Sequence, residues 1–426
     1  MKYYSTNKQA PDVTLEEAVV KGLAADKGLF MPFTIKPLPQ EFYDSIDTLG
    51  FQEIAYRVAD AFFGEDVPAD TLKQIVYDTL SFDVPLVKVT EDIYSLELFH
   101  GPTLAFKDVG GRFMARLLGY FIRKEGKKQV NVLVATSGDT GSAVANGFLG
   151  VEGIHVYVLY PKGKVSEIQE KQFTTLGQNI TALEIDGTFD DCQALVKSAF
   201  MDKELNEHLQ LTSANSINVA RFLPQAFYYF YAYAQLKKLG KANDAVICVP
   251  SGNFGNITAG LFGKRMGLPV KRFIAANNRN DIFYQYLQTG VYTPRPSIAT
   301  IANAMDVGDP SNFARVLDLY GGSHAAISYT NEQIAETMRE TWKECHYLLD
   351  PHGACGFRAL KEGLKPGETG VFLETAHPAK FLDTVEGIIG ESVEMPAKLK
   401  AFMQGEKQSL SMTKEFADFK SYLLSL

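Results

Sequence analysis

The order of hydrophobic and polar positions predicts an α/β protein. Beyond about residue 90, short runs rich in valine and isoleucine alternate with amphipathic stretches. Such alternation is typical of βαβ units built around parallel sheets. The runs that we interpret as strands are 130–135, 154–160, 180–185, 245–249, 272–276 and 370–373. The chain is long enough for two such sheets.

The first part of the chain has a different pattern and predicts mainly helix. Leu15, Ala18, Val19 and Leu23 recur at helical spacing, and a Lys-Pro-Leu-Pro segment at 36–39 interrupts the pattern. We therefore expect three consecutive domains. They are an N-terminal mainly helical domain (1–95), a smaller α/β domain (96–215) and a larger α/β domain with C-terminal helices (216–426).

Helix-start residues place further helices between the strands. Thr188, with Asp191 three residues later, predicts a capped helix over 189–200, and Ser311 predicts one over 312–320 as a plain N-cap. After Gly390 the chain is more polar and ends in an amphipathic stretch at 414–424. We expect this tail to pack on the outside of the molecule.

Composition narrows the class of protein. The 426 residues are 46% hydrophobic and 22% charged, with a net charge of −8 and no long basic run, which argues against nucleic acid or an anionic membrane as the main partner. The four cysteines have no CxxC spacing, so we expect neither a zinc site nor a disulfide scaffold. With no secretory pattern and no apolar run of about 18 residues, we expect a cytoplasmic protein without a metal ion. The sequence leaves the oligomeric state open between a monomer and a homodimer.

Two glycine-rich loops follow predicted strands and open predicted helices. Residues 136–142 read TSGDTGS, and residues 251–258 read SGNFGNIT. Small residues at a helix start let backbone N–H groups converge on an anion, and a phosphate suits the second loop best. Tight βα connections are the alternative interpretation for each loop alone. Neither loop has the dinucleotide or P-loop pattern, which weakens the case for NAD or ATP.

A third segment places a single lysine among apolar residues. Lys107 follows Phe106 within the sequence HGPTLAFKDVGGRF at 100–113. Burial there would favour the neutral amine, which is the form that attacks an aldehyde. A lone lysine is more often an exposed surface charge, so its neighbours must decide between the two interpretations.

Taken in order, the three segments resemble pyridoxal-phosphate enzymes of the tryptophan-synthase-β class, also called fold type II. Within that class the chain is most similar to the threonine synthase family, in the form found in many bacteria and in fungi. Further matching segments are YYST at 3–6, GLFMP at 28–32, ANSIN at 214–218, NAMDV at 303–307 and TAHPAKF at 375–381. The resemblance therefore covers nearly the whole chain.

This resemblance implies a fold, a cofactor and a reaction. The fold would be two parallel-sheet βαβ domains with an N-terminal mainly helical portion, and the cofactor pyridoxal 5'-phosphate. The enzyme would be a carbon–oxygen lyase acting on phosphates. It would convert O-phospho-L-homoserine and water into L-threonine and phosphate by γ-elimination and β-addition, as the last step of threonine biosynthesis.

The resemblance also implies site residues. Lys107 would be the catalytic Schiff-base lysine, and Thr375 would give its hydroxyl to the pyridine nitrogen, a neutral partner that makes the ring a weaker electron sink. The other cofactor-binding residues would be Phe106, Ser251, Gly252, Asn253, Phe254, Gly255 and Asn256. The substrate-binding residues would be Thr136, Ser137, Asp139, Thr140, Asn215, Ser216 and Arg221.

Some contacts and alternatives stay open at this point. The wider class usually has asparagine where this chain has Asp139, and His377 and Lys380 could serve structure or function equally. Another fold type II enzyme, such as a serine or threonine dehydratase or an O-acetylserine sulfhydrylase, would share Lys107 and both loops. Such enzymes need no second phosphate site, so Arg221 discriminates. A non-catalytic relative that binds the cofactor is the remaining alternative.

Overall fold

The structure, a computed structural model, describes residues 1–126, 129–320 and 325–426 and divides into two compact units. Unit 1 consists of Met1, Met31–Phe106 and Phe222–Glu394. Unit 2 consists of Lys2–Phe30, Lys107–Arg221 and Met395–Leu426. Both units are therefore discontinuous in sequence, unlike the three consecutive domains expected from the pattern.

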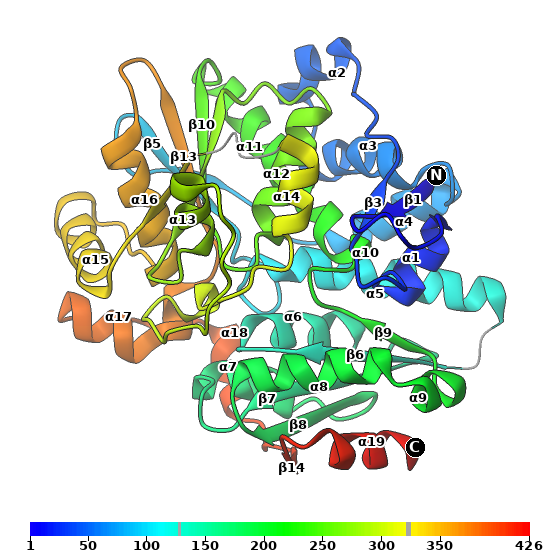
Figure 1. The fold of residues 1–426 in the computed structure, drawn as a ribbon. Helices are drawn as coiled ribbons and strands as arrows, with labels where there is room; N and C mark the ends of the chain where they lie inside the picture. The colour runs from blue at the N-terminus through cyan, green and yellow to red at the C-terminus, as the bar shows by residue number, and fades with distance from the viewer. Residues whose placement is uncertain (127–128, 321–324) are drawn as a thin grey trace. The chain divides into compact units, whose positions relative to one another are not determined.

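Unit 1 is built around a six-stranded sheet with the order β12-β11-β10-β13-β5-β4. Its strands are β4 (Leu86–Lys88), β5 (Ile93–Glu97), β10 (Ala245–Pro250), β11 (Arg272–Asn277), β12 (Ala325–Ser328) and β13 (Thr369–Glu374). Strands β5, β10 and β13 of this sheet are labelled in Figure 1. All neighbours are parallel except β4 and β5. The carboxyl ends of its parallel strands are where an open α/β sheet binds ligands.

Unit 1 also contains many helices, and some of them pack on this sheet. Its helices are α2 (Gln40–Ser45), η1 (Ile46–Thr48), α3 (Phe51–Phe63), α4 (Ala69–Thr79), η2 (Leu223–Gln225), α11 (Ala226–Lys238), α12 (Gly255–Arg265), α13 (Ile282–Thr289), η3 (Asn303–Met305), α14 (Phe313–Tyr320), α15 (Asn331–Cys345), α16 (Pro351–Gly363), η4 (Pro378–Phe381) and α17 (Leu382–Ile389). Helix α16 packs on β10, β11 and β13, and α15 packs on α16.

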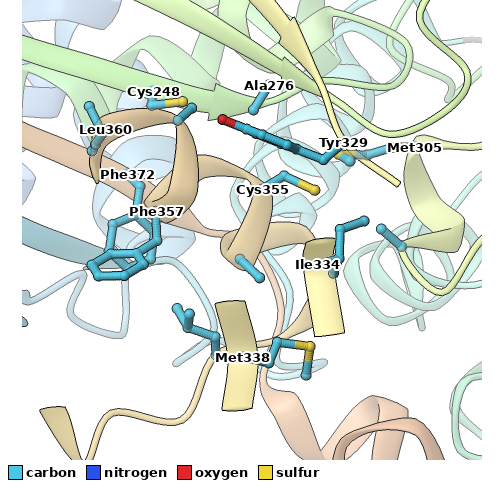
Figure 2. Close-up of a cluster of buried hydrophobic side chains, with 14 of the residues drawn as sticks. Cys248, Ala276, Met305, Tyr329, Ile334, Met338, Cys355, Phe357, Leu360 and Phe372 are labelled. Atoms are coloured by element: carbon cyan, nitrogen blue, oxygen red, sulfur yellow. The ribbon is translucent and has the colours of Figure 1, made fainter. Parts of the chain in front are cut away.

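The core between these elements is a buried cluster that includes Cys248, Tyr329, Cys355 and Phe372 (Figure 2). Met305 of η3 is 3% exposed and belongs to the same cluster. The core therefore anchors the short helix η3 as well as the long helices.

Unit 2 is built around a five-stranded parallel sheet with the order β14-β8-β7-β6-β9. Its strands are β6 (Val130–Ala135), β7 (Ile154–Pro161), β8 (Ile180–Asp186), β9 (Leu211–Ser213) and β14 (Leu410–Thr413). Its helices are α1 (Leu15–Lys21), α5 (Lys107–Glu125), α6 (Asp139–Phe148), α7 (Glu167–Thr174), α8 (Phe189–Met201), α9 (Lys203–His208), α18 (Ala397–Met403) and α19 (Phe416–Leu424). The short helix α10 (Val219–Phe222) ends at the unit boundary.

The N-terminal region combines helices with a small sheet. Strands β1 (Lys2–Ser5), β2 (Val13–Thr14) and β3 (Phe30–Pro32) form a three-stranded sheet with the order β2-β1-β3. The prediction of a mainly helical start missed these strands because each has only two to four residues. A run this short carries no alternation that a pattern could reveal.

All six predicted strands are confirmed, with shifts of at most one residue at an end. The strand residues of β6, β10 and β13 are buried throughout, as expected for parallel strands covered on both faces. The capping box of Thr188 and Asp191 at the start of α8 is also confirmed. In the described part of the chain, no helix is long and apolar enough to cross a membrane.

The C-terminal tail differs from the expected outer helix. Helix α19 begins at Phe416, and residues before it form β14, which pairs in parallel with β8 (Figure 1). Phe419 and Leu423 of α19 are fully buried in the core of unit 2. The tail thus extends the sheet and supplies core residues.

Candidate active site

Lys107 is the first residue of α5, and the segment before it is held by backbone hydrogen bonds. The amide of Phe106 donates to the carbonyl of Thr375 at 2.8 Å, and the Phe106 carbonyl accepts from the hydroxyl of Tyr228. Phe106 and Lys107 are both partly exposed. The lysine therefore begins a helix directly after a turn segment that is anchored by hydrogen bonds, and it is partly exposed.

Arg221 lies against the first turn of the same helix. A Cβ atom on Gly110, three residues after Lys107, would lie 2.3 Å from Nη1 of Arg221, so only a glycine allows this approach. The Arg221 side chain is 1% exposed, and its Nε donates to the carbonyl of Ala214 at 2.7 Å. A buried guanidinium is thus placed within one helical turn of the candidate catalytic lysine, since α-helices have 3.6 residues per turn.

The first glycine-rich loop connects β6 to α6. Thr136 is fully buried, and its Oγ1 accepts from the amides of Gly138 and Gly141 at 2.9 and 2.8 Å. Asp139 is 4% exposed, and its Oδ1 accepts from Nε2 of Gln169 at 3.0 Å. Ser137 and Thr140 are partly exposed and lie at the start of α6. Thr136 therefore shapes the loop, while two hydroxyl residues remain accessible in it.

Helices α5 and α6 approach closely within unit 2. A Cβ on Gly111 would lie 2.8 Å from the carbonyl oxygen of Ala143. Asn215 is bonded to the end of β6, because its side-chain amide accepts from the Ala135 amide at 3.3 Å and donates to the Ala135 carbonyl at 2.9 Å. Ser216, next in sequence, is partly exposed. Unit 2 thus brings Lys107, the 136–142 loop and the 215–221 segment together.

The second glycine-rich loop opens α12 in unit 1. Phe254 is the N-cap residue, with φ of +65°, and its side chain provides no capping hydrogen bond. Asn256 is 6% exposed; its Oδ1 accepts from the hydroxyl of Tyr229 at 2.7 Å, and its buried Nδ2 has no hydrogen-bond partner among the residues described. Uncapped N–H groups at a helix start, together with this buried donor, fit an anion such as a phosphate.

The remaining loop residues are held by their own contacts. Oδ1 of Asn253 accepts from the amide of Ser311 at 2.7 Å, which ties the loop to the segment before α14. The hydroxyl of Ser251 donates to the carbonyl of Val249 at 2.9 Å. Ser311 therefore contacts the candidate phosphate loop through its backbone.

Thr375 follows the last residue of β13 and is 6% exposed. His377, close by, caps η4, because its Nδ1 accepts from the amide of Ala379 at 3.0 Å. Burial, with a smaller effect of His100, lowers the pKa of His377 to about 4. Lys380 is fully buried and donates to the carbonyl of Thr103 at 2.8 Å. These contacts give both His377 and Lys380 structural roles next to Thr375.

Sequence reasoning missed three side chains that orient site residues. Tyr229, Gln169 and Tyr228 donate hydrogen bonds to Asn256, Asp139 and Phe106. Each pair is separated by 27 or more residues in the chain. Because nothing in the local pattern marks such partners, only the folded chain reveals them.

Three family models match the chain, and two of them overlap at residues 353–375. "Threonine synthase N terminus" matches residues 2–80, "Pyridoxal-phosphate dependent enzyme" matches residues 83–375, and "Threonine synthase, C-terminal" matches residues 353–423. Together they cover nearly the whole chain. The matched range of the second model contains Lys107 and both glycine-rich loops.

Individual relatives agree with the models over their full length. A threonine synthase from Serratia marcescens is 45% identical over 434 residues, covering 100% of both chains. The crystal structure of threonine synthase from Escherichia coli has a TM-score of 0.95 and 44% identity, with 100% of both chains covered. A pyridoxal-phosphate-bound threonine synthase from Brucella melitensis has a TM-score of 0.91 and 36% identity, covering 99% of this chain and 98% of that one. The chain therefore belongs to the threonine synthase family of pyridoxal-phosphate enzymes.

Proposed function

We propose that this chain converts O-phospho-L-homoserine and water into L-threonine and inorganic phosphate, with pyridoxal phosphate as its cofactor. The observation that carries this proposal is the buried Arg221 against Gly110, one helical turn from Lys107. An arginine so placed supports a substrate with a phosphate group close to the reacting carbons. Membership of the threonine synthase family agrees with this substrate.

The residues of unit 1 fit the cofactor. The uncapped start of α12 and the unpartnered Nδ2 of Asn256 suit its phosphate, and Thr375 offers a neutral hydroxyl to its ring nitrogen. When bound, pyridoxal phosphate supplies an electron sink that stabilises negative charge at the substrate Cα. We assign Lys107 as the lysine that attaches the cofactor covalently.

In this proposal Lys107 acts as the general base and general acid. Its amine takes the proton from the substrate Cα and then moves protons at Cβ and Cγ, which requires a partly accessible side chain such as this one. The phosphate leaves from Cγ, where charge gathers on its oxygens, and water adds at Cβ. Arg221 stabilises the departing phosphate, and Ser216 adds a hydroxyl donor. Asn215 anchors the 215–221 segment, because its side-chain amide donates a hydrogen bond to the carbonyl of Ala135.

The substrate carboxylate is assigned to the first glycine-rich loop. Ser137 and Thr140 are its partly exposed hydroxyl residues, and Asp139 is oriented by Gln169. Thr136 stabilises the loop, because its hydroxyl oxygen accepts hydrogen bonds from the amides of Gly138 and Gly141. The four free cysteines suit a reducing compartment, so we place the activity in the cytosol.

The decisive experiment measures phosphate and threonine together. With O-phospho-L-homoserine, the purified holoenzyme should release one phosphate for each threonine formed. Serine and threonine serve as control substrates, because a dehydratase would convert them to 2-oxo acids and ammonia. Deamination of those amino acids without phosphate release from O-phosphohomoserine would contradict the proposal.

Thr375→Val should leave the cofactor bound but slow turnover. The substitution nearly keeps the side-chain volume and removes the hydroxyl that we assign to the ring nitrogen. A net hydrogen bond is worth about 0.5–1.5 kcal/mol, so kcat should fall about two- to twelvefold. Thr369→Val at the other end of β13 is the matched control and should keep wild-type kcat. Unchanged steady-state kinetics for Thr375→Val would contradict the assignment of its hydroxyl to the ring nitrogen.

Gly252→Ala should weaken cofactor binding. A Cβ at this position would lie 2.7 Å from the carbonyl oxygen of Ala304 and 2.9 Å from Cα of Met305, so backbone atoms would have to move. Overpacking costs about 1–3 kcal/mol, so we expect the dissociation constant of the cofactor to rise about 5- to 140-fold. Gly387→Ala, where a Cβ would meet nothing within 4 Å, is the control. Equal cofactor affinities of the two variants would contradict the assignment of this loop.

A further inference from the structure

We propose that Glu374, Asp350 and His352 form a buried positioning network, which holds the backbone of Ala304 against the cofactor-phosphate loop. This inference rests on the proposed function of that loop. All members lie in unit 1, and none of the three carries a role in the reaction described above. The network would determine how firmly the cofactor is bound.

The network has an aspartate–histidine pair at its centre. Nδ1 of His352 lies 2.5 Å from Oδ2 of Asp350, and the two residues are 2% and 0% exposed. Nε2 of His352 accepts from the backbone amide of Ala304 at 3.0 Å. Because an accepting ring nitrogen carries no proton, the ring is neutral here, and Nδ1 donates to Asp350. This pair resembles a catalytic dyad in geometry, but Nε2 of His352 already accepts a hydrogen bond from the backbone amide of Ala304.

Glu374 connects this pair to the end of β13. It is fully buried, and its Oε1 accepts from the amide of Asp350 at 2.6 Å. Burial, reinforced by the nearby Asp350 carboxylate, raises the pKa of Glu374 well above its usual value. A Cβ on Gly353 would lie 1.6 Å from Oε2 of Glu374, so the glycine leaves the space that this carboxyl occupies. The next residue in the chain is Thr375, the candidate partner of the cofactor ring.

The other end of the network reaches the phosphate loop. Ala304 belongs to η3, and its carbonyl oxygen would lie 2.7 Å from a Cβ on Gly252. Met305, next in η3, is anchored in the core cluster (Figure 2). A displacement of Ala304 by a few tenths of an ångström would therefore change the space available to the loop. The His352 bond thus links the phosphate loop to β13, which ends at Glu374, the residue before Thr375.

The far side of η3 is held independently. Asp306 accepts from Nδ2 of Asn278 at 2.8 Å and of Asn280 at 3.0 Å, and from the hydroxyl of Thr300 at 2.7 Å. None of these bonds involves His352. Substitutions at His352 therefore test one side of η3 without releasing the whole segment.

The test compares three variants of the full-length protein. His352→Leu removes both polar contacts, His352→Asn keeps an amide at the Asp350 end only, and His352→Gln places an acceptor where Nε2 bonds Ala304. We measure the dissociation constant of pyridoxal phosphate by titrating the apoprotein, together with the ³¹P chemical shift of the bound cofactor's phosphate. Thr341→Val, which removes another buried hydrogen bond of unit 1, is the control for stability alone.

We expect His352→Leu and His352→Asn to bind the cofactor about ten- to a hundredfold more weakly, because a buried amide donor is left unsatisfied. Their ³¹P shift should move, whereas His352→Gln and Thr341→Val should stay near wild type. If His352→Leu does not fold, the proposal is tested by comparing the cofactor affinities and ³¹P shifts of His352→Asn and His352→Gln. Equal dissociation constants and ³¹P shifts for Asn and Gln would overturn the positioning network and leave the proposed function intact. A wild-type protein that binds no pyridoxal phosphate would overturn both.

Discussion

Lys107→Ala should lower kcat with O-phospho-L-homoserine by at least about 10³-fold. A positioned general acid–base group contributes about 10²–10⁴-fold, and the same substitution also removes the amine that we propose to attach the cofactor. The protein should remain folded, because the lysine is partly exposed and begins α5. Steady-state phosphate release at saturating substrate is the measurement that checks this loss.

Lys124→Ala is the matched control for this prediction. Lys124 lies at the other end of α5, and its side chain is 52% exposed in a surface ion pair with Glu16. Such pairs contribute little to stability, so activity should be unchanged. Borohydride reduction of the wild type should attach the cofactor to the peptide that contains Lys107. A label on a different lysine would refute the assignment.

Arg221→Ala should lose about 30- to 4,000-fold in kcat/KM for O-phospho-L-homoserine. Removing one side of a buried, hydrogen-bonded charge pair costs about 2–5 kcal/mol, and each 1.4 kcal/mol corresponds to tenfold. Because the proposed contact would also stabilise the departing phosphate, kcat should fall along with the rise in KM. The inhibition constant of inorganic phosphate should rise in parallel.

Arg221→Lys separates charge from geometry. It keeps the positive charge but loses the planar guanidinium, which can bind two phosphate oxygens at once, so we expect partial recovery only. The visible absorbance of the bound cofactor should be the same in both variants and in the wild type, which distinguishes a substrate effect from loss of cofactor. Wild-type kcat/KM in Arg221→Ala would place the substrate phosphate elsewhere and favour a dehydratase.

Local sequence was sufficient for the regular elements that carry the site. The six strands and the capped helix α8 follow from runs of apolar residues and from Thr188 with Asp191, because these patterns depend on neighbours within a few residues. Short strands such as β9 and β14 were missed, since three or four residues show no period. The division into discontinuous units also escaped prediction, because no local composition change marks where the chain returns to an earlier unit.

The sequence by itself determined the family, the cofactor and the residue types available for chemistry, since motifs such as the one around Lys107 are contiguous in the chain. Only the tertiary structure decided how those residues are supported. Arg221 reaches Gly110 across 111 positions of sequence, and His352 reaches Ala304 across 48. Contacts of this kind arise from packing of α5 and η3 within their own units, and packing depends on the whole fold rather than on neighbouring residues.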